Sequence, residues 1–279
     1  MAYKTLFSAL TDSEIINEVL PTATALSGLL DAHLDTLCLG VDRTQVASYY
    51  GGATSVLVQE AFSRAQEEAA ALEKSARAEL DRSDVRWSCQ SDIVQMADLA
   101  RIVSLHARFS DLAIAPQPYG DGRGQDIESA LEACLFDAGV PVLVTPDKCS
   151  LTALPKQVMV AWNESAEALR AVKSALPMIA QADRVHVVMV DPPAHGATRS
   201  DPGGLLSQFL ARHGHKVEVE VLSRTLPRVA DVIIRHAEDI EADLVVMGAY
   251  GHSRFREAVF GGATLYMLQH ATRPVLMAH

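Results

Sequence analysis

The stretch VVMGAYGHSRFREAVFGG, residues 245–262, decides the fold assignment. An apolar segment stops at Gly248, and further glycines follow at Gly251, Gly261 and Gly262. Glycine has no Cβ, so its backbone N–H group can approach an anion closely. The N–H groups at a helix N-terminus also attract phosphate, and a helical pattern follows the last glycine. The glycines therefore either shape turns only or hold the two sides of a phosphate chain.

The chain repeats itself around this stretch. AGVPVLVTPD (residues 138–147) resembles ATRPVLMAH (271–279), and each follows a helical pattern and an Asp-Leu strand signal. The beginnings of the two copies, YKTLFSALTDS and PKQVMVAWNES, also match. Between the copies, TPDKCSLTALP carries the prolines and small polar residues of a linker. We predict two domains, residues 1–150 and 151–279.

Strand and helix patterns alternate in the second copy. Strands are predicted at residues 157–162, 185–190, 216–222, 243–248 and 273–278. Alternation implies crossover connections and a parallel sheet, and apolar runs such as DLVVM suit a sheet that is buried on both faces. We expect an α/β chain of two tandem doubly wound sandwich domains with mostly parallel five-stranded sheets. The first copy differs in its long middle helix, whose many charges indicate a solvated face.

Bulk composition excludes several classes of function. The formal net charge is −11, which argues against a nucleic-acid footprint, because that needs a basic face. No apolar run reaches the roughly 20 residues that span a bilayer, and the N-terminus lacks the pattern of a secretory signal. Cys38, Cys89, Cys134 and Cys149 show no metal-ligand spacing. We expect a reduced, cytoplasmic chain that binds neither membrane nor nucleic acid.

The glycine stretch, flanked by ADLVV and RPVLM, resembles the nucleotide loop of the universal stress protein family. The family pattern is Gly, two residues, Gly, nine residues, Gly, then Ser or Thr. Gly248, Gly251 and Gly261 fit it, whereas Gly262 stands at the Ser/Thr position and Thr264 follows two residues later. The resemblance covers essentially the whole chain as two tandem units. It implies a fold of the adenine nucleotide alpha hydrolase type.

The resemblance also implies an adenine nucleotide, which is ATP, with Mg²⁺, or ADP or AMP. Its adenine would lie near the ends of the first two strands, and the glycine loop would take the ribose and phosphates. Carried onto this chain, the binding residues are Ala161, Trp162, Asn163, Val190, Asp191, Met247, Gly248, Gly251, His252, Gly261, Gly262, Ala263 and Thr264.

Two of these positions depart from the family pattern. Asn163 replaces the commoner Asp but can still form hydrogen bonds. Gly262 lacks the hydroxyl that would contact phosphate, and a hydrogen bond to a charged group contributes about 1.5–3 kcal/mol. We therefore expect ATP binding to be weaker by about tenfold or more, or the site to take AMP or ADP.

Several of these residues also have an ordinary structural interpretation. Trp162 is either a core or rim aromatic or the residue that stacks on adenine. Asp191 either caps a turn or contacts the ribose. His252 and Arg254 are either exposed loop residues or phosphate contacts. The sequence leaves these alternatives open.

The first copy lacks the glycine pattern. Aligned on PVL, Ala115, Pro118 and Glu128 face the three glycines, and aligned on the Asp-Leu signal, Pro116 and Tyr119 face the first two. Proline has no N–H group to offer, and the Glu128 carboxylate would point toward the anion. We predict that this copy binds no nucleotide in this way and has a structural or regulatory role. Its YGDGRGQD segment is read as a polar turn.

Neither catalytic residues nor a metal site are expected. His213 and His215 are two residues apart, but a metal site needs three or four ligands, so we interpret them as surface histidines. Ser165 and Ser253 lack the G-x-S-x-G context of a nucleophile elbow. No lysine or metal-binding acid stands out for phosphoryl transfer. We expect a regulator, with slow ATP hydrolysis and a ligand-free interaction module as the alternatives.

The resemblance further implies a role in stress-response regulation. In this interpretation nucleotide orders the loop, and an unknown protein partner reads the ordered surface. The final strands, at residues 140–145 and 273–278, are expected to join the two units as an intrachain pseudo-dimer. Further association into a homodimer is an additional expectation.

Overall fold

The computed structural model describes residues 2–43, 54–120, 122–147, 149, 151–192, 201–249 and 262–279, and for residues 54–57 the backbone alone. The chain divides into two compact units. The N-terminal unit is Tyr3–Val140, and the C-terminal unit is Pro141–His279 together with Ala2. The division therefore comes at Val140, whereas the linker pattern placed the domain boundary at residue 150.

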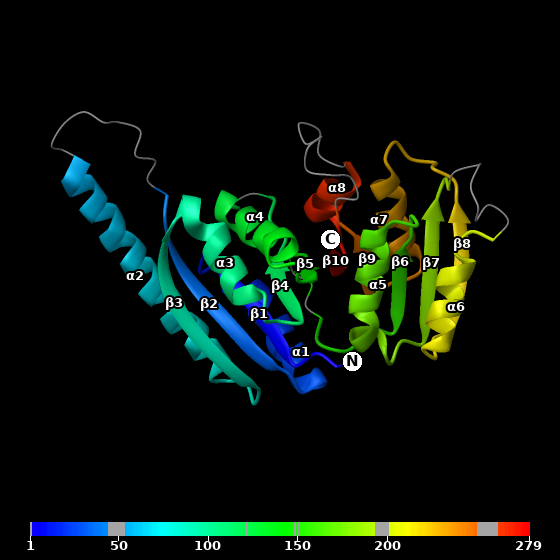
Figure 1. The fold of residues 1–279 in the computed structure, drawn as a ribbon, viewed down its shortest axis with the longest axis horizontal. Coiled ribbons are helices and arrows are strands. Elements are labelled where there is room, and N and C mark those ends of the chain that lie inside the picture. Colours follow the sequence, from blue (N-terminus) through cyan, green and yellow to red (C-terminus); the bar gives the residue numbers. More distant parts are fainter. Residues whose placement is uncertain are drawn as a thin grey trace. The chain divides into compact units, whose positions relative to one another are not determined.

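The N-terminal unit is an α/β sandwich with four parallel strands in the order β3-β2-β1-β4. Helices α1 and α2 cover one face of this sheet, and α3 and α4 cover the other (Figure 1). In chain order its elements are β1 (Thr5–Leu10), α1 (Ile16–Leu30), β2 (His33–Asp42), α2 (Thr54–Leu80), β3 (Arg86–Gln95), a 3-10 turn (Met96–Asp98), α3 (Leu99–Ala107), β4 (Leu112–Pro116), α4 (Gln125–Glu132) and a π-helical turn (Ala133–Asp137).

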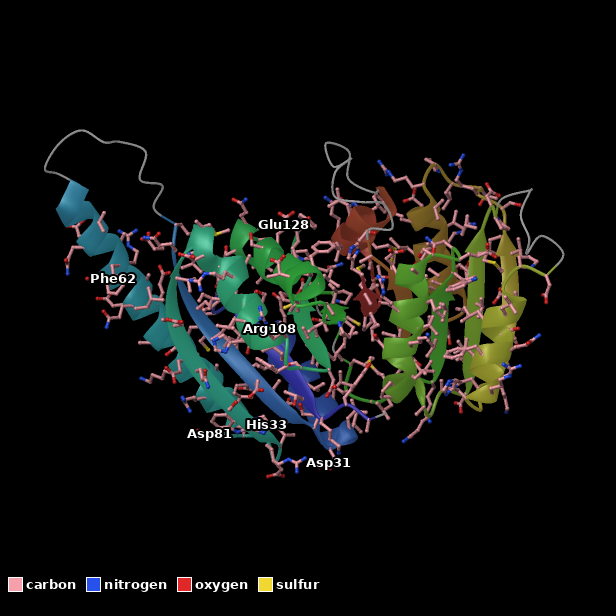
Figure 2. The ribbon with its side chains drawn as sticks, in the orientation of Figure 1. Asp31, His33, Phe62, Asp81, Arg108 and Glu128 are labelled. Carbon is pink, nitrogen blue, oxygen red and sulfur yellow. The ribbon has the colours of Figure 1, made fainter. Side chains whose placement is uncertain are left out.

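The predicted long helix is α2, and it packs closely on β2. A Cβ at Gly40 of β2 would lie 1.9 Å from the carbonyl oxygen of Ala65 and 2.9 Å from the Cβ of Ala69. Both alanines are buried, so small residues on the helix meet a glycine on the strand. The opposite side of α2 is exposed and carries charged residues and Phe62 (Figure 2), as the sequence predicts for a solvated face.

The C-terminal unit has the strand order β5-β10-β9-β6-β7-β8. Strands β6 to β10 are parallel to their neighbours, and β5 pairs antiparallel with β10. This confirms the predicted doubly wound, mostly parallel sheet: the five strands of the second copy, β6 to β10, are parallel to one another, and β5 of the first copy adds a sixth strand. The elements are β5 (Val142–Thr145), β6 (Gln157–Ala161), α5 (Ala166–Ile179), β7 (Arg184–Val190), α6 (Gly204–Arg212), β8 (Val217–Leu222), α7 (Val229–Asp239), β9 (Leu244–Gly248), α8 (Gly262–His270) and β10 (Val275–Ala278).

The central strands of this unit are apolar because helices cover both of their faces. Helices α5 and α6 lie on one face, and α7 and α8 lie on the other (Figure 1). Val158, Met159 and Val160 of β6 are at most 1% exposed, and the first four residues of β9 are also buried. Uninterrupted apolar strands are the pattern of a parallel sheet between two helical layers.

The pairing of β5 explains why the division falls before this strand. Val144 is in register with Val275, and Val142 is in register with Met277. The fifth strand of the first sequence copy thus belongs to the compact unit of the second copy. Among the helices of the described residues, none combines the length and the apolar character that crossing a bilayer requires.

Candidate functional site

The carboxyl ends of three strands meet at one edge of the C-terminal sheet. β6 lies between β7 and β9, and the chain runs from β6 outward to β8 before it returns to β9. Such a reversal is the switch point at which open α/β sheets bind ligands. Ala161, the last residue of β6, is in register with Val188 and Met247, and Gly248 is in register with Ala278. The predicted residues from the first, second and fourth strands of the copy therefore come together.

The segment after β6 turns directly into α5. The Trp162 N–H donates to the Val188 carbonyl at 2.8 Å, so the backbone stays beside β7 for one more residue. The Asn163 side-chain oxygen accepts from the Ser165 N–H at 3.2 Å, and Glu164 has a φ of +63°. Ser165 then caps the helix, because its Oγ accepts from the Ala168 N–H at 3.0 Å. Asn163 thus both shapes this turn and lies exposed at the sheet edge.

The segment after β7 is held to β8. The Asp191 N–H donates to the Leu222 carbonyl at 2.9 Å, and an Asp191 carboxylate oxygen accepts from the Arg224 N–H at 3.2 Å. Asp191 has a φ of +45°, which is unusual for a residue other than glycine. These contacts support the interpretation in which Asp191 shapes a turn. Its side chain is exposed, and Val190 beside it is half-buried.

Gly248 at the end of β9 permits a close helix contact. A Cβ at this position would lie 2.6 Å from the Ala168 backbone nitrogen and 2.9 Å from the Glu167 carbonyl carbon. Both atoms belong to the first turn of α5, so a side chain here would push the helix away from the strand. The first glycine of the motif therefore has a packing role that does not depend on a ligand.

Helix α8 begins at Gly262, directly after the glycine loop. Gly262 is exposed, and an added Cβ would meet no described atom within 4 Å. Ala263 is half-buried, and Thr264 is buried at 5% exposure. The first N–H groups of an α-helix have no partner within the helix, so this end can donate to an anion. Three predicted site residues lie outside the described residues: Gly251, His252 and Gly261.

Sequence reasoning missed the contribution of the first turn of α5. Ser165 was considered only as a nucleophile, whereas the structure shows it as the N-cap. The signal was present, because a serine that precedes a helical pattern with an acidic residue in its first turn is a common N-terminus. The same turn carries Glu167 and Ala168, which meet Gly248. The Ser165 cap thus holds the first turn of α5 in place where it packs against the end of β9.

The corresponding edge of the N-terminal unit is occupied by its own side chains. Tyr119 donates from its hydroxyl to Glu128 Oε1 at 2.6 Å, and Figure 2 shows Glu128 on α4. Asp126, in the first turn of that helix, has a side chain only 4% exposed and an ion pair at 3.1 Å to Arg43 Nη2. A carboxylate thus already lies at this helix N-terminus, where an anion would otherwise be favoured. The adjacent pocket is mostly apolar and is lined by residues such as Phe7, Ile114 and Leu131.

All four cysteines are free thiols. The sulfur atoms of Cys38 and Cys89, on neighbouring strands β2 and β3, are 3.7 Å apart. Their contact raises the pKa of Cys38 and lowers the pKa of Cys89. Cys134 is buried without such a partner, and burial raises the pKa of its thiol to about 12.

Comparison with known proteins agrees with this geometry. Residues 155–279 match the model of the universal stress protein family, which covers all but the first residues of the C-terminal unit. The C-terminal unit is a universal stress protein domain. The recognition made from the glycine spacing is thereby confirmed for this half of the chain. The chain is also 33% identical, over 142 residues, to a universal stress protein of Synechocystis sp..

That match covers 49% of this chain and 46% of the relative, so the chain spans about half the length of the curated relative. Solved structures extend the fold to both units. A universal stress protein from Archaeoglobus fulgidus has a TM-score of 0.69 at 14% identity, over 99% of this chain and 96% of its own. A protein from Pseudomonas aeruginosa has a TM-score of 0.61 at 17% identity, over 99% and 93%. Both units therefore share the overall fold of universal stress proteins.

Proposed function

We propose that this protein is a stress-response regulator that binds an adenine nucleotide at the carboxyl edge of its C-terminal universal stress protein domain. The observation that carries the proposal is the register that places the ends of β6 and β9 side by side, Ala161 opposite Met247. This edge is the switch point of the sheet, and the glycine segment leaves β9 from it. The domain assignment and the geometry thus support the same edge.

In this proposal the adenine lies against the segments that follow β6 and β7. Trp162 and Val190 are half-buried there and offer apolar surface, and the exposed Asn163 offers a side-chain amide. The Asn163 carbonyl oxygen already accepts from Ser165, so its NH₂ group donates to a ring nitrogen. The apolar surface of Trp162 and Val190 with the Asn163 amide beside it suits a flat heterocycle better than a highly charged group.

The phosphates lie toward the start of α8. Its first N–H groups and its dipole favour an anion, and none of the described atoms lies within 4 Å of a Cβ added at Gly262. No hydroxyl occurs at this position, so the third phosphate of ATP loses one donor. We propose that AMP or ADP is therefore bound more tightly, relative to ATP, than it would be with serine at position 262.

Substitution of Gly262→Ser tests this assignment. An added Cβ meets no described atom, so serine should fit at this position, and its hydroxyl should tighten ATP by about tenfold, since a charged hydrogen bond contributes about 1.5–3 kcal/mol. AMP affinity should change less. Isothermal titration of the full chain with each nucleotide measures both values. Gly262→Ala, which adds the Cβ without the hydroxyl, is the matched control and should bind ATP about as wild type does.

Two further outcomes separate the proposal from its alternatives. Mass spectrometry of gently denatured purified protein should detect a co-purified adenine nucleotide. Absence of retained nucleotide together with no titratable binding would leave a ligand-free interaction module. Steady release of ADP from added ATP would instead indicate slow hydrolysis.

The N-terminal unit serves a structural or regulatory role without nucleotide in this proposal. The Asp126 carboxylate at the start of α4 and the Tyr119–Glu128 hydrogen bond support it, because they fill the corresponding edge. We place the protein in the cytoplasm, where the adjacent thiols of Cys38 and Cys89 would stay reduced. Cell fractionation checks this location. The partner that reads the nucleotide state is a protein that binds near the loop and α8.

A further inference from the structure

We propose that the C-terminal unit holds a divalent transition-metal ion between β7, β8 and α7, on the sheet face away from α6. The ligands are His186 of β7 and Glu218 and Glu220 of β8. His236 of α7 lies beside these ligands, with its Nε2 3.1 Å from Glu220 Oε2. This site is separate from the nucleotide edge, and no part of it depends on the proposed function.

Strand register brings these side chains to one face. His186 pairs with Glu218, and Val188 pairs with Glu220, in the parallel ladder between β7 and β8. Partners in register point to the same side of a sheet, and residues two apart do so as well. A Cβ at Gly203, which precedes α6, would instead approach Val187 and Val219 on the other face. The histidine and both glutamates therefore lie beneath α7.

The distances suit a shared cation. One ligand atom from each of the three residues lies within 4.8 Å of the others. His186 Nδ1 is 2.7 Å from Glu220 Oε1 and 3.8 Å from Glu218 Oε2. Ligand atoms of a tetrahedral zinc ion with bonds near 2.0–2.2 Å are roughly 3.3 Å apart, and these two distances bracket that value. Small side-chain rotations would complete the coordination.

Charge and burial favour a cation over an ordinary ion pair. The His186 side chain is only 8% exposed, and that of Glu220 is 29% exposed. Two carboxylates lie beside His186, and the only guanidinium ion-paired with them within the described residues is Arg184, whose Nη1 is 2.9 Å from Glu218 Oε1. A partly buried carboxylate such as Glu220 needs a positive partner, and a dication would neutralise it together with the more exposed Glu218.

His236 supplies a second, independent sign. Its Nε2 is buried and forms no hydrogen bond with any described residue, although it lies 3.1 Å from Glu220 Oε2. The short distance without hydrogen-bond geometry leaves a buried nitrogen unsatisfied, which is costly. A metal drawn to the other oxygen of Glu220 would reorient that carboxylate and let His236 donate to it. Ligating carboxylates are commonly held in this way.

The donor set identifies the class of metal. Imidazole and carboxylate ligands together suit zinc and its first-row neighbours, whereas magnesium and calcium favour oxygen ligands alone. Glu218 is 49% exposed, so the site opens to solvent at the sheet edge and leaves room for a water ligand. The bound ion would tie α7 to the outer strands of the sheet.

Titration of the metal-free full chain with Zn²⁺ tests the proposal. Calorimetry should give one ion per chain, and Zn²⁺ should raise the thermal midpoint, with reversal by EDTA. Mg²⁺ at the same concentration should do neither. Failure of the wild-type chain to bind one Zn²⁺ would overturn the site.

Variants locate the ion. Glu218→Gln should weaken Zn²⁺ binding by at least about tenfold, and its exposed position means that the metal-free chain should keep its circular dichroism spectrum. His186→Asn should abolish binding. His213→Asn is the matched control and should bind Zn²⁺ like wild type, because His213 is exposed. The neighbouring His215 is buried, so its interpretation as a surface histidine was wrong. Unchanged affinity in Glu218→Gln, or lost affinity in His213→Asn, would each refute the assignment.

Discussion

At the scale of single residues, the glycines of the motif have different structural roles. Gly248 is needed because α5 packs against the end of β9, with no room for a Cβ. A Cβ added at Gly262 would meet none of the described atoms within 4 Å, and α8 begins at this residue. One spacing pattern thus contains a glycine that packing requires, Gly248, and a glycine at the helix start where we propose that the ligand binds, Gly262. The glycine spacing predicted both positions but could not tell these roles apart.

Gly248→Ala should destabilise the protein by about 1–3 kcal/mol, the usual cost of overpacking, because its Cβ would overlap the backbone of Ala168. Gly262→Ala is the matched control. It meets no described atom and should be neutral or slightly stabilising. Urea denaturation of the full chain measures both effects. Equal stability of the two variants would contradict the packing role of Gly248.

Cys134 predicts a pH dependence of stability. Burial raises the pKa of its thiol to about 12, whereas an unfolded thiol titrates near about 8.5. A raised folded-state pKa means that its contribution is complete below about pH 8.5 and declines as the pH rises toward 12. At pH 10.5 the loss should be roughly 2–3 kcal/mol.

The check is the free energy of unfolding of the wild type and of Cys134→Ala between pH 8 and pH 10.5. The alanine variant leaves a cavity, whose cost does not depend on pH, but it lacks the titrating group. The difference between the two proteins should therefore shrink by roughly 2–3 kcal/mol over this range. Parallel curves would show that the thiol does not contribute.

At the scale of secondary-structure elements, helix–strand contacts decide the layers. α2 meets β2 at Gly40, where the Ala65 carbonyl oxygen lies 1.9 Å from the position of a Cβ. The two nearest atoms that a side chain at Gly40 would meet belong to the α2 backbone, so no side-chain rotation can remove the overlap. The same principle operates where α5 meets β9. Each unit thus has a glycine at a helix–strand contact that leaves no room for a Cβ.

Gly40→Ala should therefore lower stability by about 3 kcal/mol or more, at the upper end of overpacking costs. Gly28→Ala on α1 is the control, because its Cβ would sit at an ordinary contact distance, 3.5 Å from Val85 Cγ1. That change should stabilise by up to about 1 kcal/mol, since alanine favours a helix over glycine. Thermal unfolding monitored by circular dichroism compares the two. A mild effect at Gly40 would mean that α2 can shift.

At the scale of the whole molecule, the repeats in the sequence and the compact units of the structure do not have the same boundary, because β5 of the first copy belongs to the C-terminal unit. This strand comes from the first copy, yet it pairs antiparallel with β10 at the edge of the C-terminal sheet. Val275, Leu276 and Met277 of β10 are all at most 1% exposed. An apolar strand of this kind cannot be left as an open edge without risk of association. The intrachain pseudo-dimer of the two units stays a prediction.

A fragment of residues 151–279 tests the importance of this pairing. It lacks β5, so β10 becomes an edge strand, and two copies should associate through it. Sedimentation velocity over a wide concentration range should show a dimer or larger species for the fragment and less association for the full chain. A fragment that stays monomeric throughout would show that β5 is dispensable for covering the edge.

The sequence by itself determined the tandem repeat, the alternation of strands and helices, and the edge at which the glycine segment leaves the sheet. These features are local, because periodicity, turn residues and glycine spacing each involve residues that are close together in the sequence. The resemblance predicted that the two final strands meet, but only the tertiary structure decided that β5 belongs to the compact unit of the other copy, that a Cβ at Gly248 would collide with α5, and that His186 faces Glu218 and Glu220. These facts depend on strand register and helix packing, which bring distant residues together and which no short window of sequence specifies.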